Sequence, residues 1–208
     1  MPLSIERFVV GPIHTNSYVV TQDSKACLII DPADGCDEML RWIVSKALIP
    51  EAIVLTHGHF DHCMGIPAVL EVYPHLSVWL HPDDRQVITS PDLNGAFLIG
   101  STYVYTGSLQ LLAEGILHIG SFTCEVVHVP GHTPGGCALL FDGNCIVGDS
   151  LFAGSVGRSD FTLSDGELLI RGIQKKLMTL PDTTVVYPGH GNRTTIGRER
   201  RLNPFLQD

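Results

Sequence analysis

The heptapeptide Thr56-His57-Gly58-His59-Phe60-Asp61-His62 constrains this chain more than any other segment, because it holds four potential metal ligands within six residues. An apolar run at residues 52–55 precedes it and a stretch with helical apolar spacing follows, so we expect a strand-to-helix turn. Burying so many imidazoles and a carboxylate without partners would be costly. The turn therefore needs a cation or water beside it.

Three further candidate ligands occur singly, far along the chain: His132, Asp149 and His190. Each follows an apolar run, and glycines beside all three allow the backbone to turn sharply and approach an ion. Functional residues from distant segments commonly meet where strands end at a rim. We therefore expect these three side chains to join those of the heptapeptide.

The order of elements favours a layered fold. Short runs rich in Val and Ile predict strands at residues 7–10, 17–20, 26–30 and 52–55. Helical spacing predicts helices at 37–48 and 61–73. The second half predicts strands at 116–119, 124–129, 137–141, 145–147 and 184–187 and a helix at 165–178. Strands followed by helices in both halves indicate two sheets packed face to face with helices outside, a four-layer αββα sandwich.

Length and charge restrict the classes of function. A chain of 208 residues is expected to form one domain over residues 1–208. Its formal net charge of -9 opposes a polyanion, so nucleic acid is a disfavoured partner. One basic cluster stands near the C-terminus, and we interpret it as a solvated helix face balanced by Glu199; it comprises Arg193, Arg198, Arg200 and Arg201.

The sequence predicts a cytoplasmic protein without a membrane partner. Its first seven residues lack the basic start and apolar stretch of a secretory signal. No window reaches the roughly 18 uninterrupted apolar residues of a membrane span. The six cysteines form no C-x-x-C pair, and contexts such as Cys27-Leu28-Ile29-Ile30 are typical of buried strand, so we expect reduced core thiols.

The heptapeptide with its three distant partners resembles the metallo-β-lactamase superfamily over essentially the whole chain. Within it, three segments are similar to the glyoxalase II (hydroxyacylglutathione hydrolase) branch: Thr15-Asn16-Ser17-Tyr18, Asp31-Pro32 and Gly148-Asp149-Ser150-Leu151-Phe152. The resemblance implies that Asp149 bridges two metal ions. It implies one ion held by His57, His59 and His132, and a second held by Asp61, His62 and His190.

The resemblance implies two divalent metal ions as cofactors. Nitrogen and oxygen ligands suit zinc, which is our first expectation, and also iron or manganese. Such a pair, roughly 3.5 to 4 Å apart, can share a water and lower its pKa toward about 7. We therefore expect a metal-bridging hydroxide to attack a thioester carbonyl, with Asp61 and Asp149 as catalytic residues. A closed structural metal site is disfavoured, because seven such ligands around two ions leave open positions.

The expected substrate is a small thioester, S-acylglutathione such as lactoylglutathione or a related compound. Arg158 stands nine positions after Asp149, where glyoxalase II enzymes carry a basic residue that contacts glutathione. Asp160 and Asn192 stand where the family commonly has tyrosines, and we place Arg158 and Asn192 in the substrate site. Longer family members add a C-terminal helical domain, so a sequence ending at Asp208 resembles the short, bacterial-type proteins.

Three alternatives stay open. The segment Gly157-Arg158-Ser159-Asp160-Phe161 also resembles persulfide dioxygenases, which use a single iron held by two His and one Asp. Oxygen uptake on glutathione persulfide would identify that activity. A nuclease of the same superfamily would need a basic surface, and its binding would depend on salt. A noncatalytic metal-binding module is the least favoured alternative.

Overall fold

The strand β3 (Ala26–Ile30) is buried on both of its faces and shows how the layers form. In the computed structural model, which describes residues 3–22 and 25–207, Cys27 and Ile29 enter one apolar cluster. Ala26, Leu28 and Ile30 enter a second cluster on the opposite face. Alternate side chains of a strand point to opposite faces, so this sheet must be covered on both sides.

The first sheet has the strand order β1-β2-β3-β4-β5-β6. The first three strands are antiparallel, and β3 to β6 run parallel to one another. Parallel neighbours need crossover connections, which the helices of this half supply. The strands are β1 (Ser4–Val10), β2 (Thr15–Thr21), β3, β4 (Ile49–Val54), β5 (Ser77–Leu80) and β6 (Leu109–Leu111).

The second sheet has the order β14-β13-β10-β9-β8-β7 and is antiparallel except between β10 and β13. A small hairpin, β11 (Leu151–Phe152) with β12 (Ser155–Val156), stands apart from it. The strands are β7 (Gly115–Ile119), β8 (Phe122–His128), β9 (Cys137–Phe141), β10 (Asn144–Gly148), β13 (Val185–Pro188) and β14 (Thr194–Thr195).

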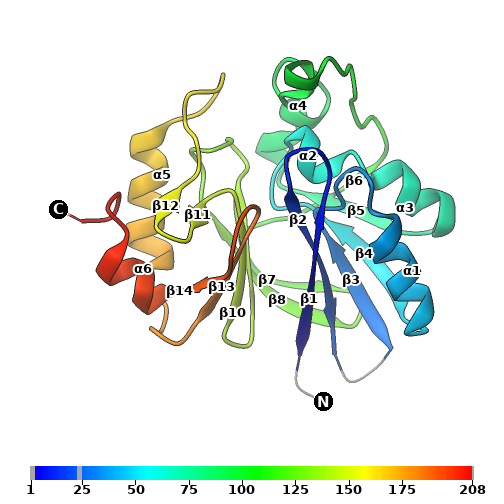
Figure 1. Cartoon of the computed structure of the whole chain (residues 1–208), viewed down its shortest axis with the longest axis horizontal. Helices are drawn as coiled ribbons and strands as arrows, with labels where there is room; N and C mark the ends of the chain where they lie inside the picture. The colour runs from blue at the N-terminus through cyan, green and yellow to red at the C-terminus, as the bar shows by residue number, and fades with distance from the viewer. Residues whose placement is uncertain (1–2, 23–24, 208) are drawn as a thin grey trace.

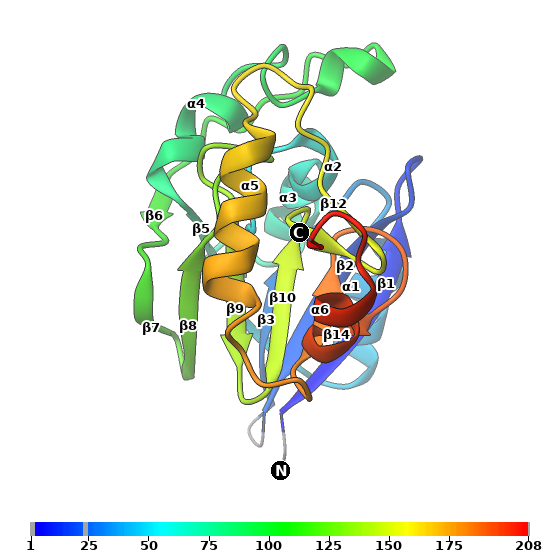
Figure 2. The same ribbon diagram turned by 90° about the vertical axis from the view of Figure 1, so that its left-hand side faces the viewer.

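Helices cover the outer face of each sheet, and Figure 1 shows them on opposite sides of the molecule. Figure 2 shows α5 lying over the second sheet, where its Leu169 joins side chains of β9 and β10. The helical segments are α1 (Asp37–Ser45), α2 (Phe60–Cys63), α3 (Ile66–Val72), η1 (Pro82–Asp84), α4 (Arg85–Ile88), η2 (Ala96–Ile99), α5 (Gly166–Gly172), η3 (Ile173–Leu177) and α6 (Ile196–Leu202).

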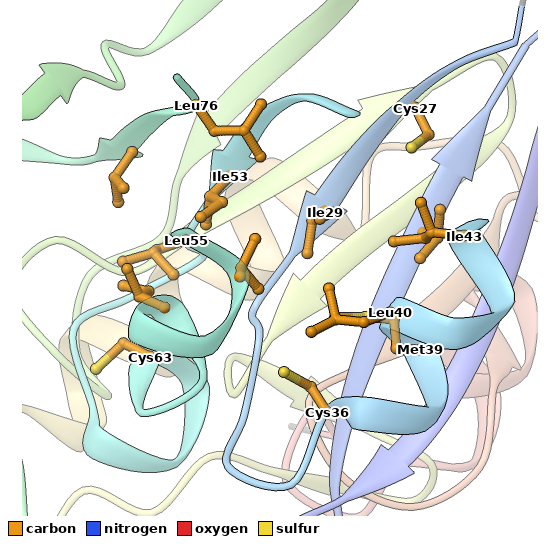
Figure 3. Packing of buried hydrophobic residues seen from close by; sticks show 14 of the residues in the cluster. Cys27, Ile29, Cys36, Met39, Leu40, Ile43, Ile53, Leu55, Cys63 and Leu76 are labelled. Carbon is orange, nitrogen blue, oxygen red and sulfur yellow. The ribbon is translucent and has the colours of Figure 1, made fainter. Parts of the chain in front are cut away.

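Three apolar clusters separate these four layers. The first lies between the first sheet and its helices, where Met39 and Ile43 of α1 pack over β3 (Figure 3). The second lies between the sheets and joins Tyr18 of β2 to Phe141 of β9. The third lies beneath α5 and α6. Two mixed sheets with helices outside confirm the four-layer αββα architecture.

The prediction of one continuous helix over residues 61–73 is wrong, because the structure has two helices there, α2 and α3, which are separated at Gly65. The backbone N–H of Gly65 donates a hydrogen bond to the carbonyl of Pro32 at 2.9 Å. A Cβ atom there would collide with the carbonyl oxygens of Ala33 and Pro32. The close approach of the segment after β3 therefore interrupts the helix.

The basic C-terminal segment has the expected solvated face, because all four of its arginines are exposed. Glu199 is buried and points inward, accepting hydrogen bonds from the backbone N–H of Gly154 (2.7 Å) and the hydroxyl of Thr194 (2.6 Å). Arg198 Nε lies 3.7 Å from Glu199 Oε1, and Arg200 and Arg201 pair with Asp182. The positive charge of this cluster is thus balanced by Glu199, as expected, and also by Asp182 outside the helix.

All six cysteines are buried and unpaired, as expected for core residues. Within residues 3–22 and 25–207, no helix combines the length and apolar character needed to cross a bilayer.

Candidate metal centre

The topology brings the candidate ligands to one edge of the two sheets. The heptapeptide follows β4, while His132, Asp149 and His190 follow β8, β10 and β13. The strand β9 is antiparallel to both β8 and β10, and β10 is parallel to β13. Consequently β8, β10 and β13 all end at the same edge. A hydrogen bond from the N–H of Cys137 to the carbonyl of Thr56 (2.8 Å) joins this edge to the first sheet.

The side chains form two triads. The ligand atoms of His57, His59 and His132 lie within 4.8 Å of one another, and those of Asp61, His62 and His190 do the same. In the first triad, His59 Nδ1 and His132 Nε2 are 2.9 Å apart. In the second, His190 Nε2 and His62 Nε2 each lie 3.2 Å from Asp61 Oδ2. The structure therefore brings together every predicted ligand.

Asp149 lies between the triads. Its Oδ2 is 3.6 Å from His132 Nε2 of the first triad and 3.5 Å from His190 Nε2 of the second. Its Oδ1 is 3.4 Å from His62 Nε2. A carboxylate in this position contacts members of both groups, which is the arrangement that the bridging prediction requires.

Hydrogen bonds behind the imidazoles fix their orientation. His132 Nδ1 donates to the backbone carbonyl of Arg158 at 2.7 Å, and His62 Nδ1 is 3.0 Å from Asp31 Oδ2. The carbonyl can only accept, so His132 carries its proton on Nδ1 and presents the lone pair of Nε2 to the centre. Carboxylate and carbonyl partners of this kind orient metal-binding histidines in proteins.

The donor set fits a dinuclear metal centre. Three buried atoms make no hydrogen bond although they face the cluster: His57 Nε2, His62 Nε2 and Asp149 Oδ1. Buried polar atoms are normally paired, so these atoms call for a cation. Gly189 leaves the space open, since a Cβ atom there would collide with Asp149 and approach the His62 ring at 2.6 Å.

The electrostatics also favour positive charge at the centre. Burial, with the neighbouring His132, lowers the pKa of His59 to about 3, so His59 is neutral at pH 7 as a ligand must be. Burial opposes a charge on His62, but the carboxylates of Asp61, Asp149 and Asp31 outweigh it and raise its pKa well above the usual range. Three carboxylates around one buried ring thus make this place favourable for a cation.

Asp31, which lies in a segment that the resemblance singled out, supports the centre through contacts that the sequence did not reveal. Its two oxygens accept hydrogen bonds from the N–H of Thr56 (2.7 Å) and the hydroxyl of Thr56 (2.6 Å), in addition to the contact with His62. It is buried and adopts a positive φ of 50°, which non-glycine residues rarely adopt. Asp31 therefore links the end of β3 to the heptapeptide.

The segment Thr15-Asn16-Ser17-Tyr18 holds two ligand loops. Thr15 donates to Asp61 Oδ2 at 2.8 Å. The Asn16 amide donates to the carbonyls of Pro188 (2.8 Å) and Gly191 (2.9 Å), which lie on either side of His190. Tyr18 donates to the carbonyl of Pro188 at 2.6 Å. The resemblance singled out this segment, and its contacts give the physical reason.

Asp84 is a buried carboxylate that sequence reasoning missed. It accepts hydrogen bonds from the N–H of Gly58 (2.8 Å), the hydroxyl of Thr133 (2.8 Å) and the N–H of Gly135 (2.6 Å). Gly58 lies between two ligands of the first triad, and Thr133 adjoins the third. One carboxylate thus ties together the two loops that form the first triad.

We expect Asp84→Asn to weaken zinc binding at the first triad about 10- to 100-fold, the usual effect of losing a partner behind a ligand. The amide of this variant would point N–H groups at the groups that now donate hydrogen bonds to Asp84. The free energy of unfolding should therefore also fall by about 2–4 kcal/mol. Competition with a chromophoric chelator measures the first effect and urea unfolding the second. Asp83→Asn is the matched control, since its side chain is 57% exposed, and should change stability by less than about 0.5 kcal/mol. If Asp84→Asn and Asp83→Asn had the same zinc affinity and stability, Asp84 would not be a support of the first triad.

A cavity of about 380 Å³ opens above the cluster. Its walls include His59, Asp61, His132, Asp149 and His190, together with the predicted substrate residue Arg158. Asn192 is placed elsewhere, in a separate hollow with Arg7 and Tyr187. The structure thus brings Arg158, but not Asn192, to the wall of this cavity.

Comparisons with known proteins identify the family of this chain. The family model described as "Metallo-beta-lactamase superfamily" matches residues 10–190. The chain is 34% identical over 209 residues to the hydroxyacylglutathione hydrolase GloC of Haemophilus influenzae, covering 98% of each chain. The structure of the BLEG-1 B3 metallo-beta-lactamase has 38% identity and a TM-score of 0.94, covering 99% of this chain and 100% of that one. The structure of TTHA1623 in a di-iron-bound form has 36% identity and a TM-score of 0.87, covering 97% and 100%. The chain therefore belongs to the metallo-beta-lactamase superfamily.

Proposed function

We propose that this chain is a metal-dependent thioester hydrolase that acts on S-acylglutathione or a related small thioester. The observation that carries the proposal is the meeting of two ligand triads at Asp149, on the wall of an open cavity. Structural metal sites are closed by protein ligands, whereas catalytic sites keep a position free. The similarity to a hydroxyacylglutathione hydrolase also supports it.

Two divalent ions held by the two triads and Asp149 would supply Lewis acidity, which activates water as a nucleophile and polarises a carbonyl. The residues of this chain prepare the site for that chemistry. Arg158 and Asp31 fix the rings of His132 and His62 from behind. Thr15 donates to Asp61 Oδ2, which limits how that carboxylate can turn. The site is therefore held in place before substrate enters.

The cavity wall favours a thioester over an amide. Among the described residues that line it, every carboxyl and imidazole group belongs to the metal cluster. An amine leaving group needs a proton donor, whereas a thiol ionises near pH 8.5 and departs as thiolate. A site with no separate acid is thus suited to the better leaving group.

For the metal, we propose zinc first, with iron or manganese as alternatives. Histidine and carboxylate ligands accept all three, and availability decides among them as much as affinity. The similarity to a protein solved in a di-iron-bound form gives iron specific support. Metal analysis of the purified protein, with two ions per chain expected, tests this part of the proposal.

A substrate panel tests the reaction. Zinc-loaded protein should release thiol from lactoylglutathione or an acyl-N-acetylcysteamine with kcat/KM at least about 100-fold above that for a chromogenic β-lactam. The β-lactam is included because a similar structure is a B3 metallo-beta-lactamase. Faster ring opening of the β-lactam would replace the proposal with a lactamase. Oxygen uptake by iron-loaded protein on glutathione persulfide, without thioester cleavage, would replace it with a dioxygenase.

A further inference from the structure

The cavity beside the metal centre is apolar on the sides away from the ligands. Ile13, Leu98 and Ile99 line it and are 43%, 55% and 41% exposed, although exposed aliphatic side chains normally stand singly. Phe152 and Phe161 complete this apolar wall, with the Phe161 ring 5.3 Å from that of His59. An apolar wall beside reactive groups is suited to an apolar substituent of the substrate.

Arg158 is the one arginine or lysine among the residues that line this cavity. Its guanidinium group already forms an ion pair with Asp160. Its Nε donates to Asp160 Oδ1 at 3.0 Å, and its Nη2 donates to Asp160 Oδ2 at 2.9 Å. This is the fork geometry with which a guanidinium binds any carboxylate. The guanidinium carbon also lies 4.5 Å from the ring centroid of Phe161, so one face is covered.

Arg158 lines both this cavity and an adjoining groove of about 810 Å³. A substrate too long for the first cavity would extend past Arg158 into the groove, where it meets the ion pair. A carboxylate on that part of the substrate would compete with Asp160 for the same guanidinium edge. An uncharged substituent would leave the pair intact.

We propose that Asp160 is a specificity-determining residue, which makes the site favour thioesters with apolar, uncharged substituents over thioesters of carboxylate-bearing thiols such as glutathione. This inference rests on the proposed function and narrows its substrate class. The side chains of Arg158 and Asp160 are 65% and 68% exposed, so Asp160 competes only moderately with a substrate carboxylate for the guanidinium. Exposed ion pairs of this kind change an equilibrium by only a few-fold.

The test compares binding of two stable thioethers, S-hexylglutathione and S-hexyl-N-acetylcysteamine, by calorimetry. Zinc-loaded wild-type protein should bind the neutral thioether more tightly. Asp160→Asn should lower the Kd of S-hexylglutathione about three- to tenfold and change that of the neutral thioether by less than about twofold. The double variant Asp160→Asn, Arg158→Gln should lose this gain in affinity for S-hexylglutathione, because it has no guanidinium group to bind the carboxylate.

Glu38→Gln is the matched control, because it removes the same charge from an exposed position on α1. An unchanged ratio of the two Kd values in Asp160→Asn, or the same change in Glu38→Gln, would overturn the inference. Thioethers cannot be hydrolysed, so this result does not depend on turnover. Absence of thiol release from every thioester would instead overturn the proposed function alone.

Discussion

Removal of metal with a chelator is expected to lower thioester hydrolysis at least about 100-fold, and added zinc should restore it. The reason lies in the donor set, because the buried atoms His57 Nε2, His62 Nε2 and Asp149 Oδ1 have no hydrogen-bond partner in the protein. Among the described residues that line the cavity there is no serine, threonine or cysteine to attack a carbonyl without a metal. Thiol release before and after dialysis against chelator measures the effect.

The same treatment should lower thermal stability. A ligand present at about 100 times its Kd stabilises the folded state by about 2.7 kcal/mol per site. For a chain of this size, each kcal/mol corresponds to about 2–4 °C in Tm. Zinc should therefore raise Tm by about 5–10 °C per occupied site, measured by calorimetry at a fixed zinc concentration. Magnesium, a poor match for imidazole ligands, is the control. An unchanged Tm with zinc would contradict metal binding by these residues.

The architecture and the ligand set could be predicted because their signals are local. The run Cys27-Leu28-Ile29-Ile30 is apolar on both faces, which indicates a strand between two layers, and the structure confirms it. The histidines of the heptapeptide are concentrated in one turn, and His190 directly follows an apolar run and a glycine. Such patterns can be recognised without knowing what lies opposite in space.

The supporting residues could not be predicted, because their roles depend on distant partners. Asp83 and Asp84 are neighbours in one polar turn, yet the first is 57% exposed and the second is fully buried against Gly58, Thr133 and Gly135. No local pattern distinguishes them. Glu199 similarly stands among arginines, and only the orientation of α6 turns it inward. Tertiary contacts, and not the periodicity of the sequence, decide whether these side chains are buried.

Replacement of Asp149 by alanine is expected to lower kcat on the best thioester by about 1000-fold or more. Its oxygens lie 3.4–3.6 Å from ring nitrogens of His62, His132 and His190, so this carboxylate contacts both triads. Two cations held close together repel strongly unless an anion lies between them. Metal content should therefore fall from two ions per chain toward one.

Three variants separate the role of this carboxylate from general damage to the fold. Asp149→Asn keeps the size of the side chain and removes its charge, so it should also lose metal and activity, because charge between the cations is what matters. Asp34→Ala removes an exposed carboxylate and should retain both. Circular dichroism of each variant establishes that it is folded. If Asp149→Ala kept two ions and full turnover, Asp149 would not be the group that joins the two triads.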